Sequence, residues 1–497
     1  MKRTLLLALA ATTILLTGFA DAQRGRPQEG PLSEPSLSER SGTPTRPPGE
    51  RRPAPHEPRR ISLELDFEPA GRAVAADHVV VRFANEMPDW QRRQVVTAAG
   101  GAGFRPARRD VFTRVDVAPG DSVDGLLARL NGVAGVVSAE PDPLCWAPAI
   151  RAVTSVASAA AAADFTDPLF PLQWTLQRIR LPEAVERNGT GGGGVIVAVL
   201  DTGVAFGGGG GFPSRRGLDL EGASFLPGLD LVDGGPPFDD GSGSENPSSP
   251  RFGHGTFVAA QIVAQVNNGI SGAGVAPRVT ILPVRVLGTG GFGTFSDVAE
   301  GIDFAVAHGA KVINMSLGGS EGAGFLQAAV QRAAAAGVVL VASAGNEADE
   351  PEPPDDVGFP ARYQQVIAVG ASGFDDQRVD YSNTGPGLEI MAPAGENAGT
   401  EVGNGLPDGA VAPSFVHFPA SGETLYSTFV ANGTSFSAPQ VAGGAALLIA
   451  LGVEDPEVLR DLLQVTVRDL DAAGFDEQTG HGLLDLLEAH RGLGFSF

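Results

Sequence analysis

The feature that most limits the possible folds is a series of short, uninterrupted apolar runs in the last two thirds of the chain. The runs occupy residues 195–200, 279–286, 311–316, 338–343, 366–371 and 388–392. A strand that is buried on both faces has this unbroken apolar pattern. Helix-like runs lie between them, at residues 257–266, 296–307 and 325–336. Alternating strands and helices predict an α/β domain of three layers, with a mostly parallel sheet between two layers of helices.

Three glycine-rich islands lie where such a sheet carries its functional groups, at strand ends and helix starts. Asp201 ends the first apolar run, and His254 lies between two glycines directly before a helix-like run. Ser435 lies in the sequence Asn-Gly-Thr-Ser-Phe-Ser-Ala-Pro, between a strand-like run at 425–431 and a helix-like run at 438–450. A serine at a helix entrance suits a nucleophile, because the helix dipole favours a developing negative charge.

A serine hydroxyl becomes a nucleophile only with a base in hydrogen-bond reach and a third group that fixes the tautomer of that base. His254 is the candidate base. Asp201 would be a costly buried carboxylate without a partner, and an imidazole offsets that cost. The alternative is three ordinary glycine-rich turns and a structural histidine. The order Asp, His, Ser in these local contexts favours a catalytic triad.

The three islands resemble the signature blocks of the subtilisin-like (subtilase) serine proteases. The resemblance spans about residues 166–490 and implies a subtilisin-like domain that cleaves peptide bonds through an acyl-enzyme. The block at 342–346 resembles the one that supplies an oxyanion-hole asparagine. It implies that Asn346 binds the oxyanion together with the backbone N–H of Ser435. No organic cofactor is expected.

Two further blocks resemble the substrate-binding segments of the family. Residues 316–318 resemble an edge that pairs with an extended substrate backbone. Residues 357–360 resemble a segment whose glycine leaves the primary specificity pocket open for a sizeable P1 side chain. The resemblance implies these substrate-binding residues: Ser316, Leu317, Gly318, Ala344, Gly345 and Gly358. Glu347 at the rim is a candidate for tolerating basic P1 residues.

The stretch at 267–274, Asn-Asn-Gly-Ile-Ser-Gly-Ala-Gly, resembles the calcium loop of the family. The resemblance implies an oxygen shell of the kind that Ca²⁺ prefers. The ligands it implies are Asp167, Asp219, the side chain of Asn268 and the backbone carbonyls of Ile270 and Gly272. The alternative is an ordinary Asn-Gly turn.

The first 75 residues predict export followed by a spacer. Residues 1–22 combine a charged start, an apolar core and an Ala-Asp-Ala cleavage pattern, which is typical of a secretory signal peptide. Residues 23–75 are rich in proline and arginine and bury too little apolar surface to offset their ordering entropy, so we expect them to be disordered. A basic binding arm is the alternative. The protein is expected to be secreted, and to be extracellular, or periplasmic if a second membrane is present.

Two segments separate the spacer from the peptidase domain expected at 166–497. Residues 76–142 have a strand–helix–strand–helix–strand pattern, which is compatible with a small ferredoxin-like α+β domain. They are similar to the inhibitory propeptide of the family, which implies an intramolecular inhibitor that assists folding and is then removed by the enzyme itself. Residues 143–165 are rich in alanine and are expected to form an exposed linker with the processing region. A short helix is the alternative.

Charge and cysteine content restrict the partners. Residues 1–163 carry 20 Lys and Arg against 18 Asp and Glu, whereas residues 164–497 carry 15 against 40. Such an acidic domain is not expected to bind nucleic acid or an anionic membrane. Cys145 is the only cysteine, so an intrachain disulfide is excluded, and its surroundings do not suit a thiol nucleophile. We expect a monomer that acts on proteins or peptides.

The sequence departs from the family pattern near two of the three blocks. Phe257 and Ala260 stand where histidine and glycine are common. Phe436 and Gln440 stand where methionine and histidine are frequent. None of these is a triad or oxyanion position, so they do not argue against activity.

The leading hypothesis is an exported serine endopeptidase that is made as a self-processing zymogen. A neutral-to-alkaline optimum is expected, because an acid peptidase of the sedolisin type would have a glutamate in place of His254. The alternatives are a non-catalytic binding protein on a subtilase scaffold and a maturase with one narrow protein target. Insertions at 205–218 and 395–424 are longer than in compact members and are candidates for reshaping the cleft rim.

Overall fold

The computed structural model describes ten segments of the chain. They are residues 60–61, 74–108, 111–147, 153–155, 165–189, 191–206, 219–237, 251–349, 356–396 and 408–493. The chain divides into the units 1–54 and 55–497, and every described residue belongs to the second. The expected signal peptide, nearly all of the spacer and most of the insertion at 205–218 lie outside the described residues. No helix of the described part is long and apolar enough to cross a membrane.

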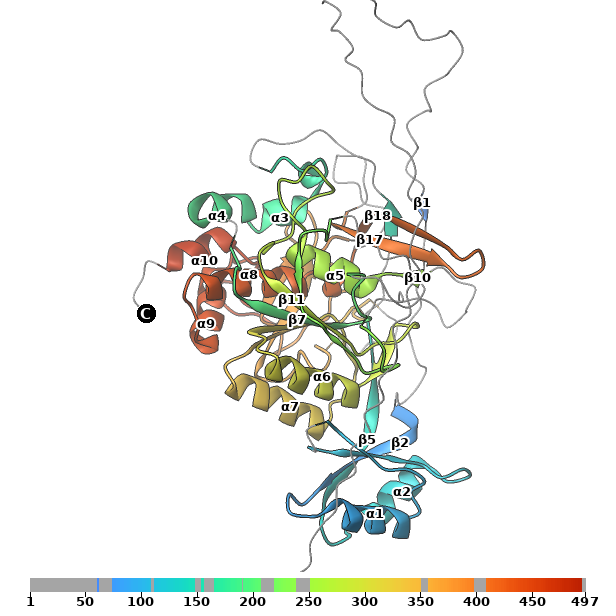
Figure 1. Ribbon diagram of the computed structural model, residues 1–497. Helices are drawn as coiled ribbons and strands as arrows, with labels where there is room; N and C mark the ends of the chain where they lie inside the picture. Colours follow the sequence, from blue (N-terminus) through green and yellow to red (C-terminus); the bar gives the residue numbers. More distant parts are fainter. Residues whose placement is uncertain are drawn as a thin grey trace, which may run out of the picture. The chain divides into compact units, whose positions relative to one another are not determined.

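A parallel sheet of eight strands forms the centre of the described part (Figure 1). Its strands are β7 (Ile196–Asp201), β8 (Ser224–Phe225), β9 (Leu229–Asp230), β11 (Thr280–Arg285), β13 (Val312–Met315), β14 (Val339–Ser343), β15 (Val366–Ser372) and β16 (Ile390–Pro393). The order is β16-β15-β14-β13-β7-β11-β8, and β9 also pairs with β11. Every pairing in this sheet is parallel, as the alternation of strands and helices predicts.

Helices cover both faces of this sheet. They are α5 (His254–Val263) and α8 (Ala438–Ala450) on one face, and α6 (Phe295–Ala307) and α7 (Gly324–Ala335) on the other (Figure 1). Successive residues of a strand point to opposite faces. Val197 and Val199 of β7 are therefore buried in the core with α5 and α8, whereas Ala198 and Leu200 are buried with α6 and α7. The α/β fold class expected from the sequence is confirmed.

Shorter helices surround this domain. A separate antiparallel sheet contains the strand that precedes Ser435 in the chain. The helices are the 3-10 turn η1 (Phe170–Leu172), α3 (Trp174–Arg178), α4 (Leu181–Asn188), α9 (Pro456–Thr466) and α10 (Leu486–Gly492). The sheet order β1-β6-β18-β17-β10 joins β1 (Arg60–Ile61), β6 (Val153–Ser155), β10 (Arg251–Phe252), β17 (Ala410–Phe418) and β18 (Glu423–Ala431). The long β17–β18 hairpin takes up residues 410–424 of the insertion at 395–424, and β18 ends four residues before Ser435.

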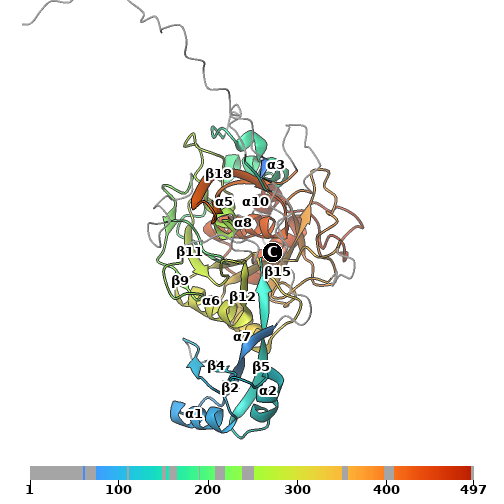
Figure 2. The ribbon, with the colours of Figure 1, turned by 90° about the vertical axis from the view of Figure 1, so that its right-hand side faces the viewer.

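An α+β unit precedes the parallel-sheet domain (Figure 2). It contains β2 (Val74–Phe83), α1 (Asp89–Ala98), β3 (Arg105–Pro106), β4 (Thr113–Asp116), α2 (Val123–Leu130) and β5 (Val136–Trp146). It has its own apolar core, in which Val79, Val81 and Val115 pack against Leu126 and Leu130. The predicted order of strands and helices is present, with β3 as an addition. This unit, residues 74–147, is the N-terminal domain.

β5 is longer than the sequence predicts. The linker was expected to begin at residue 143, but β5 continues through Trp146 and pairs antiparallel with β12 (Phe292–Thr294) of the parallel-sheet domain. The residues at 153–155, also expected as linker, form β6 and pair with β18. Backbone pairing to a distant sheet edge explains both differences, because such pairing does not depend on strong strand-forming side chains.

Candidate active site

The first part of the site lies at the carboxyl end of β7. Asp201 is the last residue of β7, His254 is the first residue of α5, and both side chains are fully buried. His254 Nδ1 lies 2.8 Å from Asp201 Oδ1, and the same oxygen accepts the Thr202 N–H at 2.7 Å. Gly255 permits this approach, because a Cβ there would lie 2.1 Å from the carbonyl oxygen of Gly203 and 3.1 Å from Asp201 Oδ1.

The second part is the turn that carries Ser435 between β18 and α8. Gly433 has a φ of 141°, a backbone conformation that residues other than glycine rarely adopt. The 3-10 turn η2 (Thr434–Phe436) then leads into α8. Ser435 Oγ lies 3.5 Å from the carbonyl oxygen of Ser316, and Ser316 Oγ donates to the Ser435 carbonyl at 2.7 Å. The nucleophile candidate is therefore tied to the end of β13.

Aromatic packing brings the histidine and serine segments together. The ring centroids of His254 and Phe436 are 5.5 Å apart, and those of Phe257 and Phe436 are 4.6 Å apart. Phe257 and Phe436 are two of the departures from the family pattern, and they contact each other. Gln440, a third departure, donates to the carbonyl of Phe436 at 2.8 Å. The three replacements thus form one packed group beside the serine turn.

The hydrogen bonding of His254 leaves one ring nitrogen for chemistry. His254 Nε2 is buried and has no hydrogen-bond partner among the residues that the structure describes. Because Asp201 engages Nδ1, a neutral His254 carries its proton on Nδ1 and its lone pair on Nε2. This tautomer can accept a proton from a nearby hydroxyl group.

Asn346 is held with its amide nitrogen as a donor. It follows β14, and its Oδ1 accepts hydrogen bonds from Thr434 N at 2.9 Å and from Thr434 Oγ1 at 2.7 Å. Both lone pairs of that oxygen are engaged, which fixes the orientation of the amide. Because Thr434 directly precedes Ser435, the NH₂ group of Asn346 is anchored to the serine turn. Such a donor can stabilise an oxyanion.

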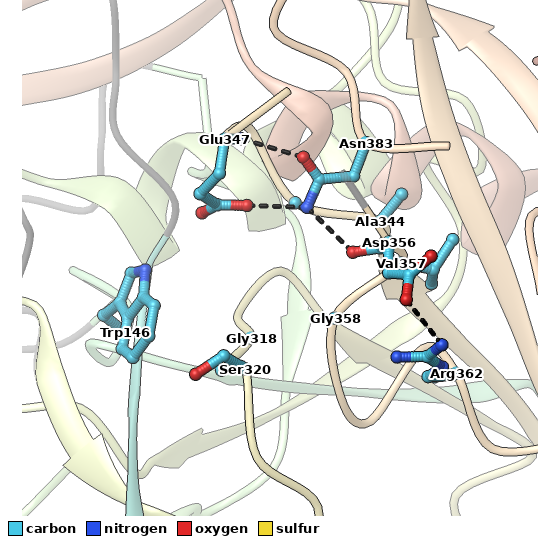
Figure 3. Close-up of a pocket in the computed structure, with 12 residues that line it drawn as sticks. Trp146, Gly318, Ser320, Ala344, Glu347, Asp356, Val357, Gly358, Arg362 and Asn383 are labelled. Carbon is cyan, nitrogen blue, oxygen red and sulfur yellow. Dashed lines mark hydrogen bonds and ion pairs between the residues drawn. The ribbon is translucent and has the colours of Figure 1, made fainter. Parts of the chain in front are cut away.

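A pocket lies beside this turn (Figure 3). It is lined by Trp146, Gly318, Gly319, Ser320, Ala344, Gly345, Glu347, Asp356, Val357, Gly358, Arg362 and Asn383. Four of the expected substrate-binding residues are among them, whereas Ser316 and Leu317 are not. A Cβ at Gly358 would lie 3.3 Å from the carbonyl oxygen of Gly319 and 3.6 Å from that of Ala344. The glycine therefore keeps the pocket wide.

Charged groups border this pocket. Burial raises the pKa of Glu347, although its carboxylate accepts hydrogen bonds from Asn383 Nδ2 at 2.7 Å and from Asn346 N–H at 2.8 Å. Arg362 forms an ion pair with Asp356 at 2.7 Å (Figure 3). Sequence reasoning missed Asp356, Arg362 and Asn383. Asp356 and Arg362 flank the predicted pocket segment at 357–360, which is the only sequence signal for them. No sequence signal points to Asn383.

The edge beside the pocket is paired with the chain itself. Trp146 and Gly318 exchange two backbone hydrogen bonds of 2.9 Å, and the Ala147 N–H donates to the Gly291 carbonyl at 3.0 Å. Trp146 also lines the pocket. The end of β5 thus occupies the place at which the sequence predicts an extended substrate.

Comparison with known proteins identifies the family. Residues 192–482 match the family model described as Subtilase family. Alkaline elastase YaB of Bacillus sp. (strain YaB) is 37% identical over 320 residues, which is 64% of this chain and 70% of that protein. The chain belongs to the subtilase family. Subtilases are serine endopeptidases that act on proteins or peptides, and this chain is therefore a serine endopeptidase.

A further relative agrees with this assignment, and two solved structures share the fold. Subtilisin E of Bacillus subtilis (strain 168) is 36% identical over 276 residues, which is 55% of this chain and 60% of that protein. Fervidolysin from Fervidobacterium pennivorans, a keratinolytic enzyme related to subtilisin, has a TM-score of 0.64 at 23% identity and covers 87% of this chain and 63% of its own. A protease from Pseudoalteromonas arctica has a TM-score of 0.56 at 30% identity, and the match covers 66% of this chain and 99% of that one.

The residues that the sequence predicts as calcium ligands lie together in this subtilase. Asp167 accepts the backbone N–H groups of residues 267–269 at 2.6 to 3.0 Å. Asp219 Oδ1 accepts Asn268 Nδ2 at 2.6 Å, and Asn268 Oδ1 accepts the Ile270 N–H at 2.8 Å. Both oxygens of Asp167 thus hold the loop backbone. Asn268 directs its nitrogen toward Asp219, while its oxygen, which is expected as a calcium ligand, accepts the Ile270 N–H.

Burial next to a second carboxylate disfavours the charged form of Asp219. It is fully buried, and its Oδ2 has no hydrogen-bond partner among the described residues. Burial, together with the negative charge of Asp167, raises the pKa of Asp219 to about 8, while hydrogen bonds from Asn268 and Gly272 lower it. The described residues contain no group of three or more Asp, Glu, His or Cys side chains suited to a metal. A cation here would depend on carbonyl and amide oxygens as well.

Proposed function

We propose that this subtilase cleaves peptide bonds with Asp201, His254 and Ser435 as its catalytic triad. The observation that carries the proposal is the 2.8 Å contact between His254 Nδ1 and Asp201 Oδ1, with His254 Nε2 left unengaged next to the serine turn. Asn346 is the proposed oxyanion donor, since Thr434 fixes its amide.

The chemistry follows from these positions. Ser435 Oγ forms a bond to the carbonyl carbon of the substrate while its proton passes to His254 Nε2. The negative charge that develops on the carbonyl oxygen is stabilised by Asn346 Nδ2 and the Ser435 N–H. When the C–N bond breaks, His254 returns the proton to the leaving amine. Water then attacks the acyl-enzyme with His254 as base, the bond from the acyl carbon to Ser435 Oγ breaks, and His254 returns the proton to that oxygen. Asp201 stabilises the imidazolium in both halves.

Substitution of the nucleophile tests this proposal. Ser435→Ala is expected to lose measurable peptide hydrolysis while keeping its fold. Ser421→Ala removes an exposed hydroxyl in the β17–β18 turn and is the matched control, which should keep wild-type activity. Substantial activity in Ser435→Ala would contradict the proposed triad and favour a role of the chain as a binding protein.

The N-terminal domain is proposed to be an inhibitory propeptide that the enzyme removes itself. Its last strand pairs with Gly318 at the substrate edge, and Trp146 lines the adjacent pocket. We infer that self-cleavage falls between Ala147 and Val153. The chain before this interval pairs with Gly318, and the chain after it pairs with β18 directly ahead of Ser435.

Sequencing the N-termini of the purified protein tests this inference and the export signal together. A new N-terminus within residues 148–153 is expected for the wild type, and a single N-terminus at Gln23 for Ser435→Ala. Processing of Ser435→Ala alone at the same bond would show that another protease matures the chain. A mature start that retains residues 1–22 would contradict the proposed signal peptide and the secreted location.

A structural calcium ion is proposed at the Asp219 loop. The buried Asp219 Oδ2, without a hydrogen-bond partner among the described residues, fits a cation. Asp167, Asp219 and Asn268 would hold the ion with the carbonyls of Ile270 and Gly272. The ion would offset the repulsion of two carboxylates and fasten the loop to the parallel sheet; it would take no part in the peptide chemistry.

A further inference from the structure

The β17–β18 hairpin is attached to the chain segments of both the proposed base and the proposed nucleophile. β17 pairs antiparallel with β10, and β10 ends two residues before His254 (Figure 1). β18 ends four residues before Ser435. The two strands of the hairpin, each of nine residues, pair with each other along their whole length. The position of His254 relative to Ser435 therefore depends on how β17 holds the segment at β10.

The hairpin binds both backbone polar groups of Gly253, the residue before His254. The Gly253 N–H donates to the Phe415 carbonyl at 2.9 Å, and the Gly253 carbonyl accepts a hydrogen bond from Ser414 Oγ at 2.6 Å. The side chain of Ser414 is fully buried. A Cβ at Gly253 would lie 2.5 Å from Phe415 Cε1 and 2.8 Å from Ser414 Oγ, so only glycine permits this close approach.

The hydrogen bond from Ser414 acts on the peptide unit that leads into His254. The carbonyl group of Gly253 and the backbone nitrogen of His254 belong to the same planar unit. A hydrogen bond to that oxygen resists rotation of the whole unit. Rotation would move the imidazole relative to Asp201 and Ser435, and a displacement of about 1 Å in a reacting group can cost about 10²-fold in rate.

Other contacts fix the hairpin itself. Thr428 Oγ1 of β18 lies 2.6 Å from Ser271 Oγ, and both side chains are buried. The ring of Phe429 packs edge-on against Phe252 of β10, with ring centroids 5.7 Å apart. Because the hairpin is held at these points, it determines the position of the segment before His254 and does not simply follow it.

We propose that Ser414 is a positioning residue for peptide hydrolysis, which holds His254 where it can take the proton of Ser435. The proposal rests on the catalytic triad proposed above and adds a residue that supports it. Ser414 does not touch the reacting atoms, so its effect on the reaction passes through His254. Residues 410–424 of the insertion at 395–424, which the sequence predicts as a candidate for reshaping the cleft rim, thereby gain a role in placing the base.

Ser414→Ala in the full-length chain, purified as the active enzyme, tests this proposal. The Gly253 carbonyl still accepts the Phe257 N–H at 3.0 Å, so the variant leaves no bare acceptor and is expected to fold. Loss of one neutral hydrogen bond from the productive geometry should lower kcat for a chromogenic peptide by about 2- to 13-fold, with little change in KM. Ser427→Ala is the matched control. It removes a half-buried hydroxyl directly opposite Ser414 on β18 and should keep both wild-type constants.

A second measurement separates the placement of His254 from folding and from substrate binding. Phenylmethylsulfonyl fluoride reacts with Ser435 Oγ: an O–S bond forms, the S–F bond breaks with release of fluoride, and the serine proton passes to His254. The reagent has no peptide backbone to pair with Gly318. In Ser414→Ala its rate constant should fall by about the same factor as kcat. The end point of the reaction counts the folded active molecules, so misfolded chains do not lower either value.

The outcomes distinguish the positioning role from the triad. A wild-type rate of sulfonylation in Ser414→Ala overturns the positioning role alone, as does a rise in KM with unchanged kcat, or an equal loss in Ser427→Ala. His254→Ala is expected to lose measurable hydrolysis. If His254→Ala keeps wild-type activity, the proposed triad is wrong and the role of Ser414 is wrong with it.

Discussion

Thr434→Val probes how much catalysis depends on the orientation of Asn346. Thr434 Oγ1 donates to Asn346 Oδ1 at 2.7 Å, and Thr434 N donates to the same oxygen at 2.9 Å. Valine has the shape of threonine and keeps the backbone donor, so the substitution removes one of the two hydrogen bonds that fix the amide. Thr434 does not touch the reacting atoms in the proposed mechanism. It is a positioning residue.

The expected loss can be worked out from these two bonds. A neutral hydrogen bond contributes about 0.5–1.5 kcal/mol, and each 1.36 kcal/mol in a barrier is a factor of ten in rate. The kcat of Thr434→Val should therefore fall by about 2- to 13-fold, with little change in KM, because the oxyanion forms only in the transition state. Loss of the Asn346 donor itself sets the upper limit, at about 10²–10³-fold.

Steady-state hydrolysis of a chromogenic peptide measures both constants. Thr434→Ser keeps the hydroxyl and is the matched control. In the double variant with Asn346→Ala, the further loss from Thr434→Val should vanish, because no amide remains to orient. The reasoning is refuted if the losses multiply in the double variant, or if Thr434→Val raises KM and leaves kcat unchanged.

Three further substitutions or treatments test the site and its support. Gly255→Ala puts a Cβ 2.1 Å from the Gly203 carbonyl oxygen and should lower kcat/KM by about 10²-fold through displacement of His254; wild-type kinetics would show that α5 moves freely. Phe257→Leu and Phe436→Leu should show a coupling of about 0.5–1.5 kcal/mol in the free energy of unfolding, and additive effects would mean that their contact adds nothing. Chelation should lower the Tm of inactivated wild type but not that of Asp219→Asn.

The pH dependence of stability offers a separate check on the same carboxyl group. The pKa of Asp219 is about 8 in the folded chain, against an ordinary value near 3.8. The folded state then holds a proton that the unfolded state has lost, so in chelator the free energy of unfolding should fall as pH rises from about 4 to about 8. Calcium should abolish this fall, and so should Asp219→Asn. A difference between wild type and Asp219→Asn that stays constant over this pH range would contradict the assignment.

Local sequence patterns predicted the elements that position the site. The apolar runs gave the strands of the parallel sheet, and α8 and α2 begin and end where the sequence predicts. The residues of a single strand or helix suffice for these predictions. A strand buried on both faces is apolar throughout, and an element buried on one face has apolar residues at regular intervals. The glycines on either side of His254 were also informative, since close approach to β7 permits no side chain at Gly255.

Contacts between distant segments could not be predicted in this way. Ser414 lies 161 residues from Gly253 in the chain and does not stand out in its own segment. The strand at 153–155 has the same difficulty, because its partner β18 lies more than 270 residues away and backbone pairing leaves little trace in the side chains. The sequence also cannot show that Asn268 donates to Asp219, since an amide side chain can present either its oxygen or its nitrogen to a neighbour.

The residue that follows Ser435 is a phenylalanine, which has no sulfur for an oxidant to attack. Methionine is frequent at this position in subtilases, and peroxide converts its thioether to a polar sulfoxide. Phe436 is fully buried against Phe257 and has no sulfur to oxidise. Met315 and Met391 are fully buried in the core of the parallel-sheet domain. The residue beside the proposed nucleophile therefore offers peroxide no site of attack, and the turn should keep its geometry in bleaching conditions.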